Sequence, residues 1–305
     1  MPSSSSSAAS GDTAQQVPKL EAPELEMPGR GTPEGWAAGL RLRVISAVVM
    51  AAAVLLAILA GPLAFAAFVA LGAAILSWEW TRLCGRGDFG VTGTAMAVST
   101  VAAVGLAAFG RPGLGLLLAV PATALVYALA RAQRVGGAAG WVAAGVVYIS
   151  VPVVALVWLR SDPGGERLIL WLMATVWATD IGAFFAGRLI GGPKLAPRIS
   201  PKKTWAGLIG AMVSAGLVGV IADVSVPGAP SAAALAAAGA VLAAVAQAGD
   251  LGESWVKRRF GAKDSSGLIP GHGGLLDRVD GLLAAAVALA AWQWFSSGGG
   301  VLSWR

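Results

Sequence analysis

Apolar segments of bilayer-spanning length follow one another from Val44 almost to the C-terminus, and they restrict this chain more than any other feature. Lipid offers no hydrogen-bond partner to exposed backbone N–H and C=O groups, so each segment that crosses a bilayer must be a helix. Since a helix needs about 20 apolar residues to cross, the sequence predicts an all-α, polytopic integral membrane protein with about nine transmembrane helices. These lie at residues 44–60, 63–80, 91–110, 113–130, 140–159, 168–190, 205–225, 232–249 and 281–297.

The charge content excludes a soluble domain. Only 12% of the residues are charged and 56% are hydrophobic, whereas an ordinary soluble domain has about 25% charged residues. The net charge of +6 does not indicate a nucleic-acid-binding protein, because the basic residues lie between apolar segments. The single cysteine, Cys84, excludes an intramolecular disulfide and a multi-cysteine zinc site.

The first 43 residues differ in composition from the rest of the chain. They are rich in Ser, Pro, Gly and Glu, and such a segment has too little apolar surface to offset the entropy of ordering. Its start lacks the basic residues and short apolar core of a cleaved signal peptide. We therefore predict a disordered cytoplasmic tail at residues 1–43 and one membrane-embedded domain at residues 44–305.

The basic residues predict the orientation of the helices. With a cytoplasmic N-terminus and nine spans, 18 of the 22 Lys and Arg residues fall in segments inside the cell and 4 fall outside. This asymmetry is what the positive-inside rule expects. The chain is thus predicted to be a multi-pass protein of the cell membrane, with the basic loops 188–203 and 257–278 in the cytoplasm.

Small residues recur every four positions in the predicted seventh span. Gly207, Ala211, Ala215 and Gly219 form a stripe on one helix face, and such a stripe lets helix backbones approach closely. The stripe indicates helix packing, and it is compatible with a homodimer.

Acidic residues inside or beside membrane spans are costly and indicate function. Asp180 lies inside the sixth predicted span, and Asp250 follows the eighth with Glu253 three residues later. Asp277 and Asp280 repeat the three-residue spacing just before the last span. On a continuous helix, residues three apart share a face. We expect these carboxylates near the cytoplasmic ends of the spans.

Two structural roles compete with a functional one for these residues. Aspartates often cap helices, and Asp–Arg pairs often only tie loops together. Glu79 and Asp223, near the ends of other spans, fit an interfacial role best. The gathering of several carboxylates at one membrane face with five Lys or Arg residues in each of two loops favours function for the rest.

The loops 191–205 and 263–274 combine cations with glycines and prolines. Mg²⁺ prefers carboxylate oxygens and keeps waters and substrate phosphates as its other ligands. Phosphates also require Lys, Arg and backbone that can approach closely. The pattern predicts phosphoryl-type transfer, which depends mostly on positioning and charge neutralisation. The absence of a G-x-x-x-x-G-K-[ST] motif argues against a P-loop ATPase.

His272 is the only histidine in the chain, so it cannot build a histidine-rich metal site. Glycines flank it on both sides. We interpret it as a residue that lines a phosphate site rather than as an acid or base.

The polar motifs resemble those of the phosphatidate cytidylyltransferase family. The resemblance rests on Ser254-Trp-Val-Lys257-Arg258, Lys263-Asp264 and Ile269-Pro-Gly-His272-Gly273-Gly274-Leu-Leu-Asp277-Arg278-Val-Asp280, which together form a signature at 254–280. Upstream, Asp250-Leu-Gly-Glu253-Ser254 is similar to the family's D-x-x-E-S. Lys194-Leu-Ala-Pro197 and Ser200-Pro-Lys202-Lys203-Thr204-Trp205 are similar to another family motif. The chain departs from the family at Ser266-Gly267, where members often have Gly followed by a variable residue.

The resemblance implies roles for individual residues. It implies that Asp250 and Asp277 bind Mg²⁺, which the family is thought to pair with a monovalent cation such as K⁺. The catalytic set that it implies is Asp250, Asp277, Lys263, Asp264, Asp280 and Arg278. The substrate-binding set that it implies is Lys202, Lys203, Ser200, Thr204, Lys257, Arg258, His272, Gly273, Gly274, Asp180, Glu253 and Ser254.

The resemblance also implies the substrates. A phosphate oxygen of phosphatidic acid would attack the α-phosphorus of CTP, giving CDP-diacylglycerol and pyrophosphate in phospholipid biosynthesis. The lipid bilayer is then both the surroundings of the protein and the source of one substrate. No nucleic acid partner is expected.

Two alternatives remain open at this point. A CTP-dependent polyprenol or phytol kinase shares the nucleotide and metal chemistry but uses an alcohol as acceptor. A secondary transporter would use Asp180 as its coupling site. Transporters, however, bind their substrates near the midplane and often contain repeats, whereas here the polar residues gather at one face.

Overall fold

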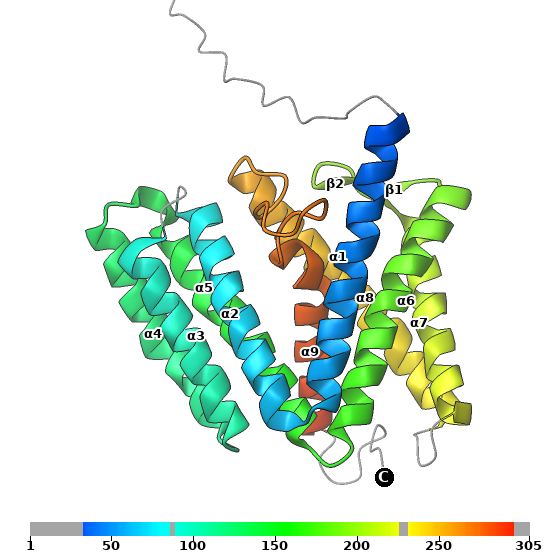
Figure 1. Cartoon of the computed structure of the whole chain (residues 1–305), viewed down its shortest axis with the longest axis horizontal. Helices are drawn as coiled ribbons and strands as arrows, with labels where there is room; N and C mark the ends of the chain where they lie inside the picture. The colour runs from blue at the N-terminus through cyan, green and yellow to red at the C-terminus, as the bar shows by residue number, and fades with distance from the viewer. Residues whose placement is uncertain (1–32, 86–88, 226–230, 296–305) are drawn as a thin grey trace, which may run out of the picture. The chain divides into compact units, whose positions relative to one another are not determined.

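The computed structural model describes residues 33–85, 89–225 and 231–295. Within these residues the chain forms nine α-helices, one 3-10 turn and one two-stranded sheet (Figure 1). The helices are α1 (Pro33–Leu59), α2 (Pro62–Cys84), α3 (Gly90–Ala108), α4 (Pro112–Ala132), α5 (Ala139–Ser161), α6 (Gly165–Leu189), α7 (Trp205–Ser225), α8 (Ala232–Arg259) and α9 (Leu276–Phe295). The turn is η1 (Gly136–Ala138), and the strands are β1 (Lys194–Ala196) and β2 (Ser200–Thr204).

The prediction of an all-α, polytopic membrane protein is confirmed. Eight helices in the described part of the chain, α1 to α8, are long and apolar enough to cross a membrane; the span in α1 is Arg41–Leu59. The last helix, α9, corresponds to the ninth predicted span. It is less apolar because Asp277, Arg278 and Asp280 lie in its first turns.

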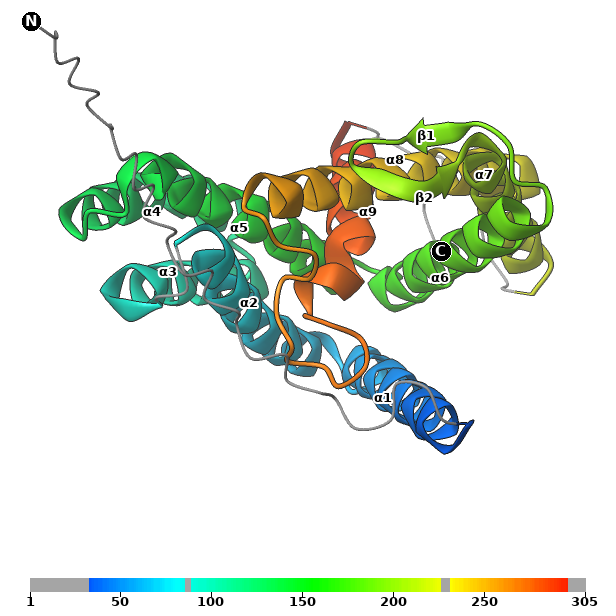
Figure 2. The same ribbon diagram turned by 90° about the horizontal axis from the view of Figure 1, so that it is seen from above.

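The helices from α2 onward pack in two groups with α9 between them (Figure 2). Helices α2, α3, α4 and α5 pack on one another, and α6, α7 and α8 pack on one another. Helix α9 contacts α8 and α5 most extensively, and also α6 and α2. The start of α9 therefore lies where both groups can reach it.

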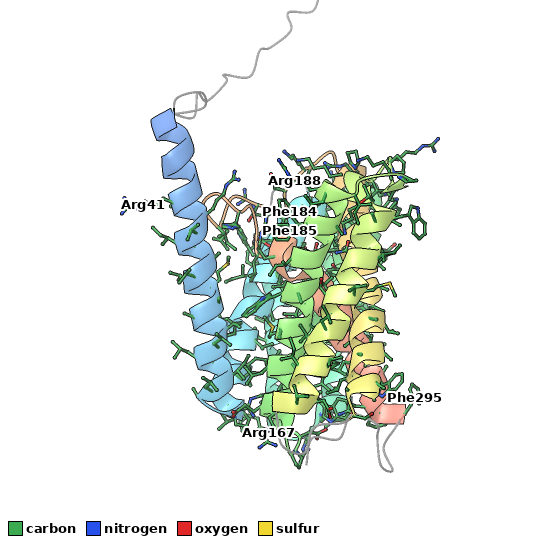
Figure 3. All side chains as sticks on the ribbon, turned by 90° about the vertical axis from the view of Figure 1, so that its right-hand side faces the viewer. Arg41, Arg167, Phe184, Phe185, Arg188 and Phe295 are labelled. Atoms are coloured by element: carbon green, nitrogen blue, oxygen red, sulfur yellow. The ribbon has the colours of Figure 1, made fainter. Side chains whose placement is uncertain are left out.

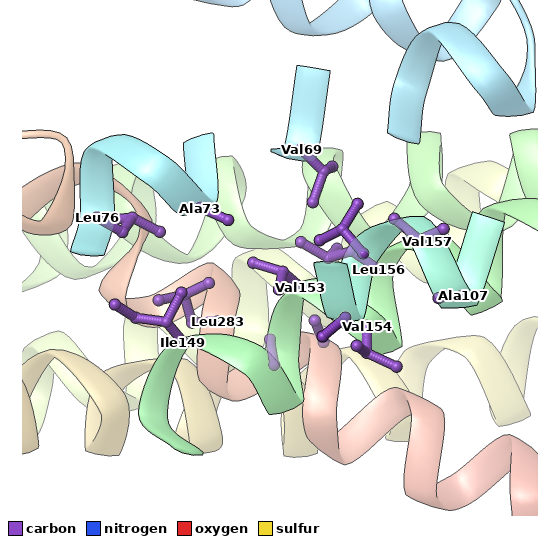
Figure 4. Packing of buried hydrophobic residues seen from close by; sticks show 14 of the residues in the cluster. Val69, Ala73, Leu76, Ala107, Ile149, Val153, Val154, Leu156, Val157 and Leu283 are labelled. Carbon is purple, nitrogen blue, oxygen red and sulfur yellow. The ribbon is translucent and has the colours of Figure 1, made fainter. Parts of the chain in front are cut away.

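Helix α5 forms the centre of the hydrophobic core. It is the most buried of the eight spans, with 72% of its most apolar window inside the protein. Ile149, Val153 and Val157 of α5 are each no more than 2% exposed. They pack in one cluster with residues such as Leu76 of α2 and Leu283 of α9 (Figure 4). The residues that carry the polar motifs are thus attached to a rigid apolar core.

Three helix boundaries differ from those predicted by five residues or more. Helix α1 begins at Pro33, eleven positions before the predicted span, so residues 33–43 of the predicted disordered tail are helical. The rest of that tail, residues 1–32, lies outside the described residues. Helix α8 continues to Arg259, ten residues past the predicted end. Helix α9 begins at Leu276, five residues early. Hydropathy marks the apolar part of a helix, whereas its hydrogen-bonded turns continue into the polar part.

The loop 191–205 contains a β-hairpin that the sequence did not predict. Strands β1 and β2 are antiparallel, with Lys194 opposite Thr204 and Ala196 opposite Ser200. Thr204 ends β2, is 3% exposed, and accepts a hydrogen bond on Oγ1 from the Gly207 backbone N–H at 3.0 Å. It therefore caps the first turn of α7.

The small-residue stripe of α7 is used inside the chain. Ala211 and Ala215 are fully buried, and a Cβ on Gly219 would meet the backbone of Leu235 in α8. The stripe therefore gives no support to a homodimer, because the close approach that it permits is with α6 and α8.

The two basic loops lie at the same end of the helices. Arg188 lies toward that end with Arg41, whereas Arg167 and Phe295 lie toward the other (Figure 3). The hairpin and the loop 260–275 lie at the upper end in Figure 1, and the upper end in Figure 3 is that of Arg188. The motifs on either side of α7 and α8 can therefore combine into one site.

Candidate functional site

Asp250 joins helix α8 to the hairpin. Its Oδ2 lies 2.7 Å from Nζ of Lys203 on β2, and its Oδ1 accepts a hydrogen bond from Ser254 Oγ at 3.3 Å. The Asp250 side chain is 34% exposed, so it remains accessible. This ion pair joins the hairpin of the loop 191–205 to α8, the helix that leads into the second basic loop.

Only one of the two adjacent lysines of β2 reaches this cluster. Lys203 is partly buried, with its side chain 16% exposed, whereas Lys202 is exposed. Successive side chains of a strand point to opposite faces, so the hairpin separates the two lysines that the sequence had treated alike. Lys202 remains available to a substrate at the surface.

Lys257 bridges two carboxylates. Its Nζ lies 2.5 Å from Oε2 of Glu253, one helical turn earlier, and 2.5 Å from Oδ1 of Asp277 at the start of α9. The three side chains are 10%, 0% and 6% exposed. Glu253 and Lys257 are four residues apart, so they meet because α8 continues past Asp250. Their ion pair in turn stabilises the polar end of α8.

The second oxygen of Asp277 organises the preceding loop. Its Oδ2 accepts hydrogen bonds from the Gly274 N–H at 2.8 Å, from the Ser265 N–H at 2.9 Å and from Ser265 Oγ at 3.0 Å. Asp277 therefore holds the two ends of the segment 265–274 together beside Lys257.

Glu79 was missed as a site residue in the sequence analysis. It lies on α2, is fully buried, and its carboxylate contacts four polar groups of the segment 265–276. Ser266 Oγ and the Leu275 N–H donate to Oε1 at 2.5 and 2.8 Å, and the Leu276 N–H donates to Oε2 at 2.6 Å. Ser265 Oγ lies 3.3 Å from Oε2 and shares its hydroxyl hydrogen with Asp277. The signal for it was an acidic residue in an apolar span, which the sequence analysis assigned to the interface.

The turn around His272 is held by its backbone. The Ile269 N–H donates to the Gly273 carbonyl at 2.8 Å, and the Arg278 guanidinium donates to the His272 carbonyl at 2.6 and 3.0 Å. His272 Nδ1 lies 2.8 Å from Ser46 Oγ of α1. Burial and the positive charges of Arg278 and Arg43 lower the pKa of His272, which favours a neutral ring.

The other predicted residues lie around this cluster. Asp180 is exposed although it lies within α6, and the charges of Asp250, Lys203 and Arg278 act on it. Asp280 lies on α9 near Asp250 and Glu253, whose charges act on it. Three further residues, Lys263, Asp264 and Arg258, are exposed, and Ser200 is partly buried. Arg258 donates to the Ala262 carbonyl at 2.9 Å, which closes the turn after α8.

The side chains of this cluster have the chemistry that a divalent cation requires. Five carboxylates outnumber the three cations that act on them. The carboxylates are those of Asp180, Asp250, Glu253, Asp277 and Asp280, and the cations are Lys203, Lys257 and Arg278. Among the described residues, Oε1 of Glu253 is a buried oxygen without a hydrogen-bond partner.

The same residues do not form a closed metal site. No group of three His, Cys, Asp or Glu side chains in the described ranges converges closely enough to hold a metal ion. Asp250 and Asp277, the predicted metal pair, have oxygens in contact with Lys203 and Lys257. Since Mg²⁺ usually takes only one or two carboxylates and completes its shell with water and phosphates, the set fits an ion that arrives with a nucleotide.

A cavity of about 600 Å³ opens beside this cluster, between the end of α2 and the segment 260–268. Trp78 and Arg82 form one side, and Phe260 and Asp264 lie opposite. The cavity adjoins the segment that Glu79 holds, but Asp250, Lys203 and Lys257 do not line it.

Gly274 is needed because there is no space for a side chain. A Cβ at this position would lie 2.5 Å from Glu79 Oε1 and would also overlap Ser265 Oγ. We expect Gly274→Ala to destabilise the protein by about 1–3 kcal/mol, as overpacking of a tight site does. The measurement is the thermal unfolding midpoint of the purified protein in detergent.

Gly267→Ala is the matched control for this prediction. A Cβ on Gly267, in the same loop, would meet nothing within 4 Å, so its unfolding midpoint should equal that of the unaltered chain. Equal midpoints for the two alanine variants would show that the loop is not packed against Glu79 as described.

A family model and two known proteins that are similar to this chain agree with one another. The model of a family described as "Cytidylyltransferase family" matches residues 41–295. A protein of Brucella suis named "Phosphatidate cytidylyltransferase" is 42% identical over 255 residues, which cover 82% of this chain and 92% of that protein. A protein of the same name from Pseudomonas aeruginosa is 39% identical over 77% of this chain and 89% of its own length.

Proposed function

Because this chain belongs to the cytidylyltransferase family, we propose that it is a phosphatidate cytidylyltransferase, which converts CTP and phosphatidic acid into CDP-diacylglycerol and pyrophosphate. The observation that carries the proposal is the cluster in which Lys203 pairs with Asp250 and Lys257 pairs with Asp277. It lies at the end of membrane helices, where a water-soluble nucleotide and a lipid headgroup can meet. The same activity is named for relatives aligned over most of this chain.

The reaction exchanges one P–O bond for another. A phosphate oxygen of phosphatidic acid forms a bond to the α-phosphorus of CTP. The bond from that phosphorus to the oxygen bridging to the β-phosphate breaks, and pyrophosphate leaves with the electron pair. The lipid phosphate is already ionised near neutral pH, so the attacking atom needs no general base. The protein must chiefly position two polyanions and offset their repulsion.

The lysines and carboxylates of the cluster divide this work. Lys203 and Lys257 supply positive charge to phosphate oxygens, and each is held in place by a carboxylate. Lys202, Lys263 and Arg258 are exposed at the same end and can bind the parts of the nucleotide that remain in water. Asp250 and Asp277 are the proposed Mg²⁺ ligands. A bound Mg²⁺ ion would draw charge from the α- and β-phosphates.

We place the active site at the cytoplasmic face of the cell membrane. The support is the distribution of basic residues, which follows the positive-inside rule when the loops 188–203 and 257–278 are inside. The two loops lie at one end of the helices, as that topology requires. CTP would then enter from the cytoplasm while the acyl chains of phosphatidic acid remain in the bilayer.

The test is a cell-free assay with the full chain purified in detergent. With CTP, phosphatidic acid and Mg²⁺, mass spectrometry of the lipid extract should detect CDP-diacylglycerol, and EDTA should abolish its formation. Failure to form CDP-diacylglycerol under conditions that support a related enzyme would refute the proposed function. Undiminished formation in EDTA would refute the proposed metal.

A further inference from the structure

Two carboxylates divide the backbone amides at the start of α9. The Gly274 N–H donates to Asp277, which lies within α9 itself, whereas the next two N–H groups, of Leu275 and Leu276, donate to Glu79. The first amides of a helix have no partner within the helix and attract negative charge. Glu79 therefore supplies, from α2, a cap that would normally come from a neighbouring residue of the chain.

Glu79 also holds the other end of the signature loop. Ser265 Oγ lies 3.3 Å from Glu79 Oε2 and 3.0 Å from Asp277 Oδ2, so one hydroxyl lies between the two carboxylates. Ser266 Oγ donates to Glu79 Oε1 at 2.5 Å and accepts from the Leu268 N–H at 3.1 Å. Ser266 is the position at which this chain departs from the family pattern, and Glu79 gives its side chain a partner.

We propose that Glu79 is a positioning residue for the cytidylyl transfer proposed above. It holds the segment 264–276 in place, and this segment in turn holds Asp277. Glu79 does not touch the proposed phosphate site. Its effect passes through Ser265 and the start of α9 to Asp277, whose other oxygen lies 2.5 Å from Lys257. The proposal rests on the proposed function, because that function is the reaction that Glu79 would serve. The contacts that hold the loop do not depend on it.

The hydrogen-bond pattern requires a carboxylate at this position. Each oxygen of Glu79 accepts from one backbone N–H, of Leu275 at Oε1 and of Leu276 at Oε2. A glutamine has nearly the same shape, but its NH₂ group would have to face one of these two N–H groups. Since a backbone N–H cannot accept, either orientation sets two donors against each other in a fully buried place. Glu79→Gln therefore releases the loop with little change in volume.

The experiment combines hydrogen exchange with steady-state kinetics on the full chain in detergent. In Glu79→Gln, amides of the segment 264–276 should exchange at least about tenfold faster, while those of α5 keep their rates. The kcat for CDP-diacylglycerol formation should fall about tenfold, since small displacements of a site are costly. The KM for CTP should rise about fivefold, which a mere loss of folded enzyme would not cause.

Two further variants make the test specific. Glu166→Gln removes a carboxylate of the same size from the start of α6, where it pairs with Arg160 at 3.3 Å, and it should leave exchange in the loop and both kinetic constants unchanged. Ser266→Ala removes a single donor and leaves the buried carboxylate, so it should fold even if Glu79→Gln does not. It should change the same quantities in the same direction by about threefold.

The outcomes separate this proposal from the proposed function. Unchanged hydrogen exchange in the segment 264–276 of both Glu79→Gln and Ser266→Ala would overturn the positioning role. Faster exchange with unaltered kcat and KM would also overturn it. If the unaltered chain forms no CDP-diacylglycerol, the proposed function fails, and the exchange rates still decide whether Glu79 holds the loop.

Discussion

Asp250→Asn is expected to reduce the rate of CDP-diacylglycerol formation by at least about 100-fold, the cost of removing one preorganised charge from a site of this kind. The variant should remain folded. Asp250 is 34% exposed, and an asparagine of the same shape keeps an oxygen that can still accept from the partly buried Lys203. The measurement is the initial rate at saturating CTP and phosphatidic acid, together with the unfolding midpoint in detergent.

Asp223→Asn is the matched control for this prediction. Asp223 lies near the C-terminal end of α7, whereas the site adjoins the start of that helix, so the same chemical change there should leave the rate unaltered. An Asp250→Asn enzyme with more than half of the normal rate would contradict the assignment of Asp250 to the site.

Lys257→Met is expected to have the largest effect on stability. It removes the cation that lies between Glu253 and Asp277, so both buried carboxylates lose their ion-pair partner, although Asp277 keeps its hydrogen bonds from Gly274 and Ser265. Breaking a buried ion pair from one side costs about 3–5 kcal/mol. The folded fraction after size-exclusion chromatography and the midpoint of thermal unfolding should both fall sharply.

A double variant distinguishes this electrostatic cause from a loss of packing. Glu253→Gln with Lys257→Met removes one negative charge along with the positive one, so it should recover part of the lost stability and remain inactive. The matched control, Lys202→Met, alters an exposed lysine of β2 and should leave the midpoint unchanged. A double variant no more stable than Lys257→Met alone would contradict the bridging role of Lys257.

The sequence was sufficient to predict the helices and the members of the charged cluster. Apolar segments of spanning length leave a chain few alternatives to membrane helices, and carboxylates at three-residue spacing share a helix face wherever the helix continues. Helix α8 does continue, and Asp250, Glu253 and Lys257 consequently lie on one stretch of it.

What the sequence could not predict depends on contacts between distant segments. The hydrogen bonds that Glu79 accepts from Leu275 and Leu276 join α2 to residues almost 200 positions later, and no local pattern contains that information. The hairpin that directs Lys203 rather than Lys202 to Asp250 is short and was hidden in a segment interpreted as a loop. The assignment of Asp250 and Asp277 to Mg²⁺ is still a prediction.

The most direct test of the central claim follows the phosphates of CTP. The full chain in detergent is given phosphatidic acid, Mg²⁺ and CTP radiolabelled at either the α- or the γ-phosphate. Our account predicts that the α-label enters the lipid product and that the γ-label is recovered only in pyrophosphate. Transfer of the γ-label to lipid would indicate a CTP-dependent lipid kinase and would contradict the account. Failure of the α-label to enter lipid would also contradict it.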